Sequence, residues 1–239
     1  MRNKVPLFRT IDKRLNIGLL ISLACVISVE FVFDKTAELF SGGAKLGEML
    51  SNLSLAFMAS YIFYVVVVHM KYVKDKEHLD PYIALKSRQL VTAIRVLTHS
   101  LILKAGVDPE NKYPSELELK KIASKTHLSD PAPEADRKIH PHINTMSDYF
   151  YHWKNISEER LEDIIGLSQY LESNHISLLL KIQESSFYGT LDIIKGINLN
   201  NDFSALSSSL YSLSQSAKNL EEYCDSNFSN TVNFSEKHG

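Results

Sequence analysis

Two long apolar runs near the N-terminus dominate the pattern of hydrophobic and polar residues. The second run, 48–70, carries no charge between Glu48 and His69. A helix of about 20 residues, rising about 1.5 Å per residue, spans the roughly 30 Å hydrocarbon core of a bilayer. A buried core helix is the alternative, but such helices are usually shorter and interrupted by charges. The pattern predicts a transmembrane helix over 48–70.

The first apolar run, 15–33, also matches a bilayer in length, with Glu30 as its one charge. It follows a basic segment, 1–14, which is also how a signal peptide begins. The residues Ser22-Leu23-Ala24-Cys25 resemble a lipoprotein processing site with its leucine displaced by one position. Because the apolar run continues well past Cys25, we expect a retained transmembrane helix over 15–33.

Basic residues beside the two runs predict the orientation. Five Lys and Arg residues lie in 1–14 and three in 71–76, whereas the intervening segment 34–47 has two, offset by two acids. Cytoplasmic flanks of membrane helices carry the excess of Lys and Arg. We therefore expect a two-pass protein of the inner (plasma) membrane, with both termini cytoplasmic and 34–47 as a short extracytoplasmic loop.

Small and polar residues within the two runs are the candidate functional positions. Small residues let helix backbones approach closely in lipid, and hydroxyl groups can hydrogen-bond across helices. Such contacts either join the two helices to each other or join several copies into a homo-oligomer. Glu30 also has two interpretations, because it either reaches water or Lys35 at the interface or lines a pore. The candidates are Gly18, Ser22, Glu30, Ser51, Ser54, Ala56 and Ser60.

From residue 71 onward, charged residues become frequent and apolar residues recur at helical spacing. Asp80-Pro81 predicts the start of a helix that continues through 82–105 and ends at Gly106. Ser115 and Glu118 predict a capping box at the start of a short helix. Three prolines in 126–141 predict a loop.

Three further helices complete the pattern. We expect a short aromatic helix over 146–154, a long helix beginning at Ser157, and a last helix over 203–224. No strand pattern is present after residue 71, so the fold class is all-α, with a transmembrane hairpin, a cytoplasmic helical domain of four or five helices over 71–225, and a polar tail over 226–239. The last helix has a heptad-like apolar seam that suits a protein partner. Its candidate contact residues are Leu206, Leu210, Leu213 and Leu220.

The sequence contains no recognisable catalytic, nucleotide-binding or cofactor motif. The net charge of −2 gives no reason to expect direct nucleic-acid binding. His127, His140, His142 and His152 cluster in sequence, but their spacing is not that of a recognised zinc site. We therefore expect no enzyme activity, no metal and no cofactor.

The paired apolar runs, the stretch Ala59–Val65 and the helical region after Lys71 resemble small bacterial two-span membrane effectors. Among these are the toxic partners of retrons and other anti-phage systems. The resemblance is architectural and carries over no functional residue. It implies abortive infection, in which a partner such as a reverse transcriptase–RNA complex restrains the cytoplasmic domain, and release lets the spans damage the membrane. The alternative is a passive anchor or scaffold that tethers a helical interaction domain.

Overall fold

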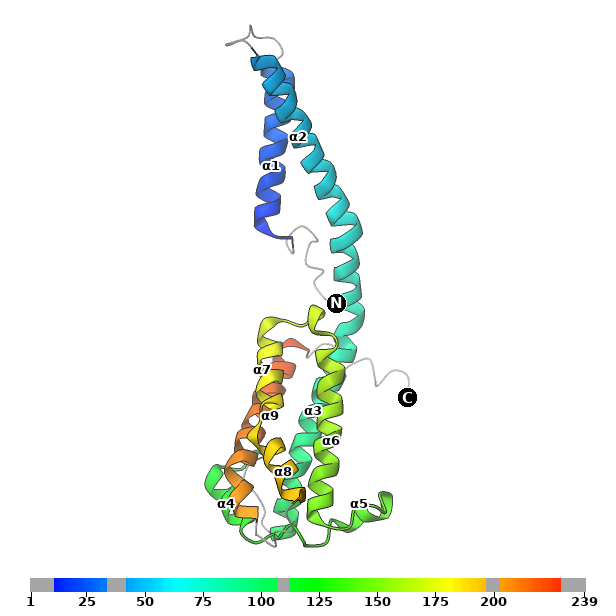
Figure 1. Ribbon diagram of the computed structural model, residues 1–239, viewed down its shortest axis with the longest axis vertical. Helices are drawn as coiled ribbons and strands as arrows, with labels where there is room; N and C mark the ends of the chain where they lie inside the picture. The colour runs from blue at the N-terminus through cyan, green and yellow to red at the C-terminus, as the bar shows by residue number, and fades with distance from the viewer. Residues whose placement is uncertain (1–10, 34–41, 107–111, 197–202, 229–239) are drawn as a thin grey trace. The chain divides into compact units, whose positions relative to one another are not determined.

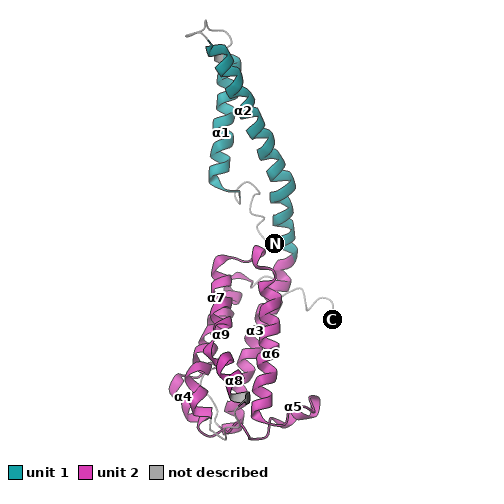
Figure 2. Ribbon diagram, viewed as in Figure 1, with its two compact units in different colours: residues 1–78 teal, residues 79–239 magenta. Residues whose placement is uncertain are grey.

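The computed structural model describes residues 11–33, 42–106, 112–196 and 203–228. Within these ranges the chain is helical and forms no strand, apart from an isolated bridge between Pro131 and Thr145, which confirms the all-α part of the prediction. The chain divides into two compact units, 1–78 and 79–239 (Figure 2). The basic segment up to residue 10, most of the predicted outer loop and the tail from 229 lie outside the described residues.

Unit 1 is built from two helices that pack alongside each other (Figure 1). Helix α1 (Lys13–Ile27) begins where the side chain of Asp12 accepts a hydrogen bond from the Arg14 N–H, and it continues into a π-helix, η2 (Ser28–Phe33). Helix α2 (Gly43–Phe63) continues into a second π-helix, η3 (Tyr64–His69). Both helical stretches are long and apolar enough to cross a membrane.

Helix α3 (Met70–Ala105) corrects the predicted helix start at Asp80-Pro81, because Pro81 lies inside it. Proline has no N–H, so the carbonyl of Glu77 loses its helical hydrogen bond at this point. Glu77 is exposed, and water can satisfy that carbonyl. The helix ends as predicted before Gly106, whose φ of +62° suits glycine.

Unit 2 contains the C-terminal part of α3 and six further α-helices among the described residues, more than the four or five expected. They are α4 (Glu116–Ala123), α5 (Glu134–Ile139), α6 (Met146–Ile165), α7 (Ser173–Gln183), α8 (Ser186–Gly196) and α9 (Ser207–Asn227), with short 3₁₀ turns η4 (Ser168–Tyr170) and η5 (Phe203–Leu206). The capping box of Ser115 and Glu118 is confirmed at the start of α4.

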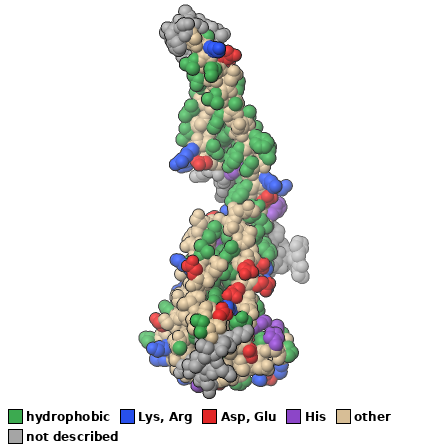
Figure 3. Space-filling view, in the orientation of Figure 1, with side chains coloured by type: hydrophobic (Ala, Val, Ile, Leu, Met, Phe, Trp, Pro, Cys, Tyr) green, Lys and Arg blue, Asp and Glu red, His purple; other side chains and the backbone are tan. Residues whose placement is uncertain are grey.

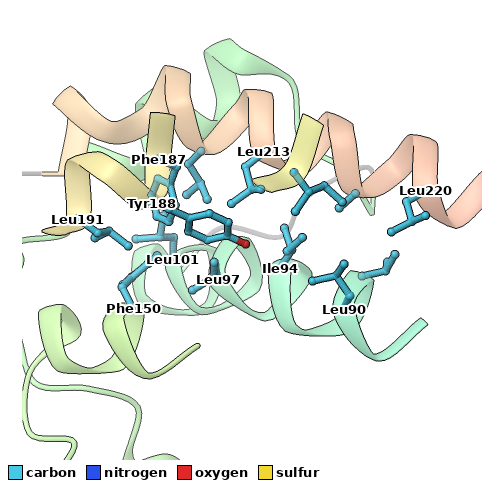
Figure 4. Close-up of a cluster of buried hydrophobic side chains, with 14 of the residues drawn as sticks. Leu90, Ile94, Leu97, Leu101, Phe150, Phe187, Tyr188, Leu191, Leu213 and Leu220 are labelled. Carbon is cyan, nitrogen blue, oxygen red and sulfur yellow. The ribbon is translucent and has the colours of Figure 1, made fainter. Parts of the chain in front are cut away.

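The core of unit 2 forms around the predicted apolar stripe of α3. Its four members, Leu90, Ile94, Leu97 and Leu101, are each 0% exposed. Figure 4 shows side chains from α6, α8 and α9 packed with this stripe, among them Phe150, Phe187 and Leu213. Burial of apolar side chains from several helices in one cluster is the main stabilising contribution in such a unit.

The region between α4 and α8 differs from the prediction in three places. The proline-containing segment 126–141 includes α5, and the two helices expected around Ser157 are one continuous helix, α6. Ser157 does not cap a helix, because its hydroxyl donates to the carbonyl of Trp153 one turn earlier. The long helix expected after Ser157 instead ends at Ile165, and the chain turns through η4 before α7.

Candidate functional site

The interface between α1 and α2 brings several of the candidate residues together. The helices run antiparallel, because residues early in α1 contact residues late in α2. Near one end, the hydroxyl of Tyr61 donates to Oδ1 of Asn16 at 2.6 Å. Near the other end, the hydroxyl of Ser51 donates to Oε1 of Glu30 at 3.2 Å. Two polar contacts thus join the helices at opposite ends of their interface.

Gly18 allows the helices to approach closely between these contacts. A Cβ atom at Gly18 would lie 2.9 Å from Cζ of Phe57, closer than carbon atoms pack. Gly18 therefore serves packing between the two helices of one chain, which is the first of the two interpretations given for the small residues. Beside this contact, Ile11, Tyr61 and Val65 form a small buried apolar cluster.

The candidate residues divide into two groups by exposure. Ser51 and Ser54 are 3% and 8% exposed on the face of α2 that meets α1, and Ser22 is half-buried on α1. Ala56 and Ser60 are exposed, and the Ser60 hydroxyl donates to the Ala56 carbonyl within its own helix. The structure does not bring Ala56 and Ser60 to the α1–α2 interface.

Asn16, Phe57 and the hydroxyl of Tyr61 are contact groups that the sequence analysis did not identify. The sequence signal was present in α2, because Ser51, Ser54, Tyr61 and Val65 recur at helical spacing on one face. The amide of Asn16 gave no comparable signal, since its partner is 45 residues away.

A buried polar cluster in unit 2 has the residue types of a nucleophilic site. Oγ of Ser87 lies 3.1 Å from Nε2 of His175, and the His175 ring packs against Tyr223 at 4.8 Å between centroids. Ser87 and His175 are 0% and 1% exposed, so a substrate cannot reach them in this conformation. Burial lowers the pKa of His175 to about 4, which keeps the ring neutral near pH 7.

Cys224 and Lys154 are two further potentially reactive side chains of unit 2, and both are buried. Burial raises the pKa of the Cys224 thiol to about 11, so little reactive thiolate forms near neutral pH. Lys154 is 4% exposed and forms ion pairs with Asp192 and Glu158. Burial alone would lower the Lys154 pKa, but the hydrogen bond from Lys154 to Asp192 and the charge of Glu158 leave it raised.

Three of the four clustered histidines meet in space. The ring centroids of His140, His142 and His152 lie 4.6 to 5.8 Å apart. Burial and the two neighbouring rings lower the pKa of His152, whose Nε2 is buried without a hydrogen-bond partner. Within the described ranges, no three His, Cys, Asp or Glu side chains are arranged to hold a metal ion.

The leucine seam of α9 lies in the core of unit 2. The four leucines are between 0% and 2% exposed, and Figure 4 shows Leu213 and Leu220 facing the apolar stripe of α3. This corrects the interpretation of a seam open to a second protein, because the chain's own helices already cover it. The residues concerned are Leu206, Leu210, Leu213 and Leu220.

Comparison with known proteins adds no relative. No protein-family model, curated protein or solved structure matches the chain. The function must therefore be argued from the residues and their arrangement.

Proposed function

We propose that the protein is a two-pass inner-membrane effector. In this proposal, α1 and the stretch from α2 through η3 cross the bilayer as a pair with both termini in the cytoplasm. Unit 2 binds or senses a partner, such as a reverse transcriptase–RNA complex, and the spans disrupt the membrane when the partner releases them. Such an effector would act in antiviral abortive infection.

The membrane part of the proposal depends on one observation. In unit 1, apolar side chains are exposed and polar side chains are buried, the reverse of the arrangement in a water-soluble protein. Leu20 and Leu53 are 65% and 70% exposed, whereas Ser51 is 3% exposed. Figure 3 shows apolar side chains along the length of the visible face of the pair. In water this arrangement is costly, because every exposed leucine keeps its apolar surface hydrated. In a bilayer it satisfies the polar groups and leaves the apolar ones in hydrocarbon.

The α9 leucine seam is covered by the other helices of unit 2, so a partner cannot bind there. A partner would instead bind to exposed residues of unit 2. Unit 2 still exposes large apolar side chains, including Leu117 at 73% and Ile139 at 71%. These exposed apolar side chains are the candidate contacts with a partner.

Induced expression in bacteria carrying a membrane-potential dye tests the effector activity. We expect depolarisation and growth arrest that co-expression of the genuine partner suppresses. A chain in which residues 11–70 are replaced by an unrelated transmembrane hairpin serves as the matched control. Unchanged polarisation and growth with the intact chain, at an expression level verified in the membrane fraction, would contradict the proposal.

Topology is tested separately with intact spheroplasts. We expect protease added from outside to leave the region beyond residue 71 intact. Digestion of that region, or recovery of the full-length protein in the soluble fraction without detergent, would contradict the proposed membrane arrangement.

A passive anchor is the second candidate function, and the α1–α2 interface favours it. Gly18, Ser51 and Glu30 are all engaged in joining the two helices, so they are not available to line a pore while those contacts last. The same hairpin replacement separates the candidates, because an anchored scaffold would keep its partner-dependent function and a membrane-disrupting effector would lose it.

A further inference from the structure

We propose that the face of α2 opposite α1 is the contact surface for a second copy of this chain, with the amide of Asn52 as its polar contact. The inference rests on the proposed membrane location and deepens it by naming the partner and the surface. It uses residues that the α1–α2 interface leaves uncovered.

The geometry of α2 defines this outer face. At about 100° per residue, Ser51, Ser54 and Tyr61 point toward α1. The residues on the opposite side recur at spacings of four, three and four, which is the spacing of a helix-packing seam. All of these seam residues are exposed, and they are Asn52, Ala56, Ala59 and Phe63.

Asn52 is the polar member of this outer seam. Its side-chain amide has no hydrogen-bond partner among the described residues, and its neighbours Met49 and Leu53 are 65% and 70% exposed apolar side chains. An amide without a partner is costly in hydrocarbon, because neither lipid tails nor water satisfy it there. The seam therefore needs an occupant that can both donate and accept a hydrogen bond at this position.

A second copy of the chain meets that requirement. A carboxamide both donates and accepts, so two Asn52 side chains can satisfy each other. Copies inserted in the same orientation place Asn52 at the same depth, and a parallel, two-fold contact brings the two amides together. Ala56 and Ala59 lack bulky side chains and allow the helices to approach closely. The Ser60 hydroxyl already bonds within its own helix and needs no partner.

The test measures association of the full-length protein in liposomes of phosphatidylethanolamine and phosphatidylglycerol. Donor- and acceptor-labelled copies are reconstituted together, and energy transfer is followed as lipid dilutes the protein. We expect energy transfer in the wild type, and Asn52→Leu should weaken association about tenfold, the scale of one interhelical polar contact. Ala59→Leu, which adds bulk to the seam, should also weaken it.

The matched control exchanges two adjacent residues, Asn52→Leu with Leu53→Asn. The exchange keeps composition and depth but rotates the amide by about 100° off the seam. We expect this variant to associate as weakly as Asn52→Leu alone. Association equal to that of the wild type in the exchanged variant, or no energy transfer in the wild type, would overturn the inference.

Flotation of the same liposomes separates this inference from the proposed function. Wild-type protein that floats with the lipid but shows no energy transfer contradicts only the self-association surface. Protein that does not float contradicts the membrane location and the inference together.

Discussion

The two units of this chain arrange apolar and polar residues in opposite ways. Unit 2 places Leu90, Leu97 and Phe150 at 0% exposure, whereas unit 1 exposes Leu20 and Leu53 and buries Ser51. In unit 2 the apolar side chains leave water on folding, which provides the driving force. In unit 1 the helices meet through polar and small residues, as helices do where the surroundings are already apolar. This contrast between the units supports the proposal that unit 1 lies in a bilayer.

The largest expected effect lies in the core of unit 2. Leu97→Ala should lower the free energy of unfolding by about 3–5 kcal/mol, because it leaves a cavity at a fully buried position. Urea unfolding of the full-length protein in nonionic detergent, followed by fluorescence of the single tryptophan, Trp153, provides the measurement. Ile139→Ala, at a position 71% exposed, is the control and should change little.

The second prediction exchanges an exposed apolar residue for a charge in each unit. Leu55→Arg in α2 should reduce membrane insertion by about 3 kcal/mol, because a guanidinium is costly in hydrocarbon. Ile139→Arg in unit 2 should leave insertion and folding unchanged, since that side chain already faces water. The fraction of each variant that floats with liposomes measures the effect. Equal flotation of Leu55→Arg and wild type would contradict the proposal that the exposed apolar face of α2 lies in hydrocarbon.

The third prediction concerns acid stability of unit 2. His175 has a pKa of about 4 in the folded state, below its ordinary 6.5, so the unfolded state binds the proton more readily between these values. Stability is therefore fully present above pH 6.5 and declines as the pH falls toward 4, by about 2 kcal/mol near pH 5.

Urea unfolding at several pH values, with the same tryptophan signal, measures this decline. His175→Gln should remove the contribution of His175 to the pH dependence, because the amide does not titrate in this range. The lowered pKa of His152 leaves a residual decline of the same sign. His99→Gln, which replaces an exposed histidine on α3, should retain it. An unaltered pH profile in His175→Gln would show that another group is responsible.

The smallest expected effect lies in the α1–α2 interface. Gly18→Val should weaken packing between the helices by about 1–3 kcal/mol, at the lower end because the aromatic ring of Phe57 can shift. Pulsed EPR between spin labels on outward-facing positions of α1 and α2 should show a longer and broader distance distribution. Phe57→Ala should restore the wild-type distance in the Gly18→Val background, and failure of that rescue would assign Gly18 another role.

Local sequence signals predicted part of the fold. The apolar stripe of α3 and the capping box of Ser115 and Glu118 depend on residues within a few positions of one another, and both are present. Ser157 gave a similar local signal but bonds within α6 instead, because a serine hydroxyl can satisfy either a helix start or the carbonyl one turn earlier.

Contacts between distant residues explain the remaining differences. The periodicity of α9 identified an apolar face, but periodicity does not reveal whether the same chain or another covers that face. The helices of unit 2 cover it. The pairing of Asn16 with Tyr61 joins residues 45 positions apart, and neither residue indicates the other in the sequence.

The two cysteines have a practical consequence for labelling studies. Cys224 is 0% exposed with a raised thiol pKa, and Cys25 is half-buried in the apolar helix α1. Charged maleimides and thiosulfonates react with thiolates in water, and Cys224 offers little thiolate near neutral pH. A cysteine newly introduced on the surface of unit 2 should therefore carry a dye or spin label without removal of Cys224.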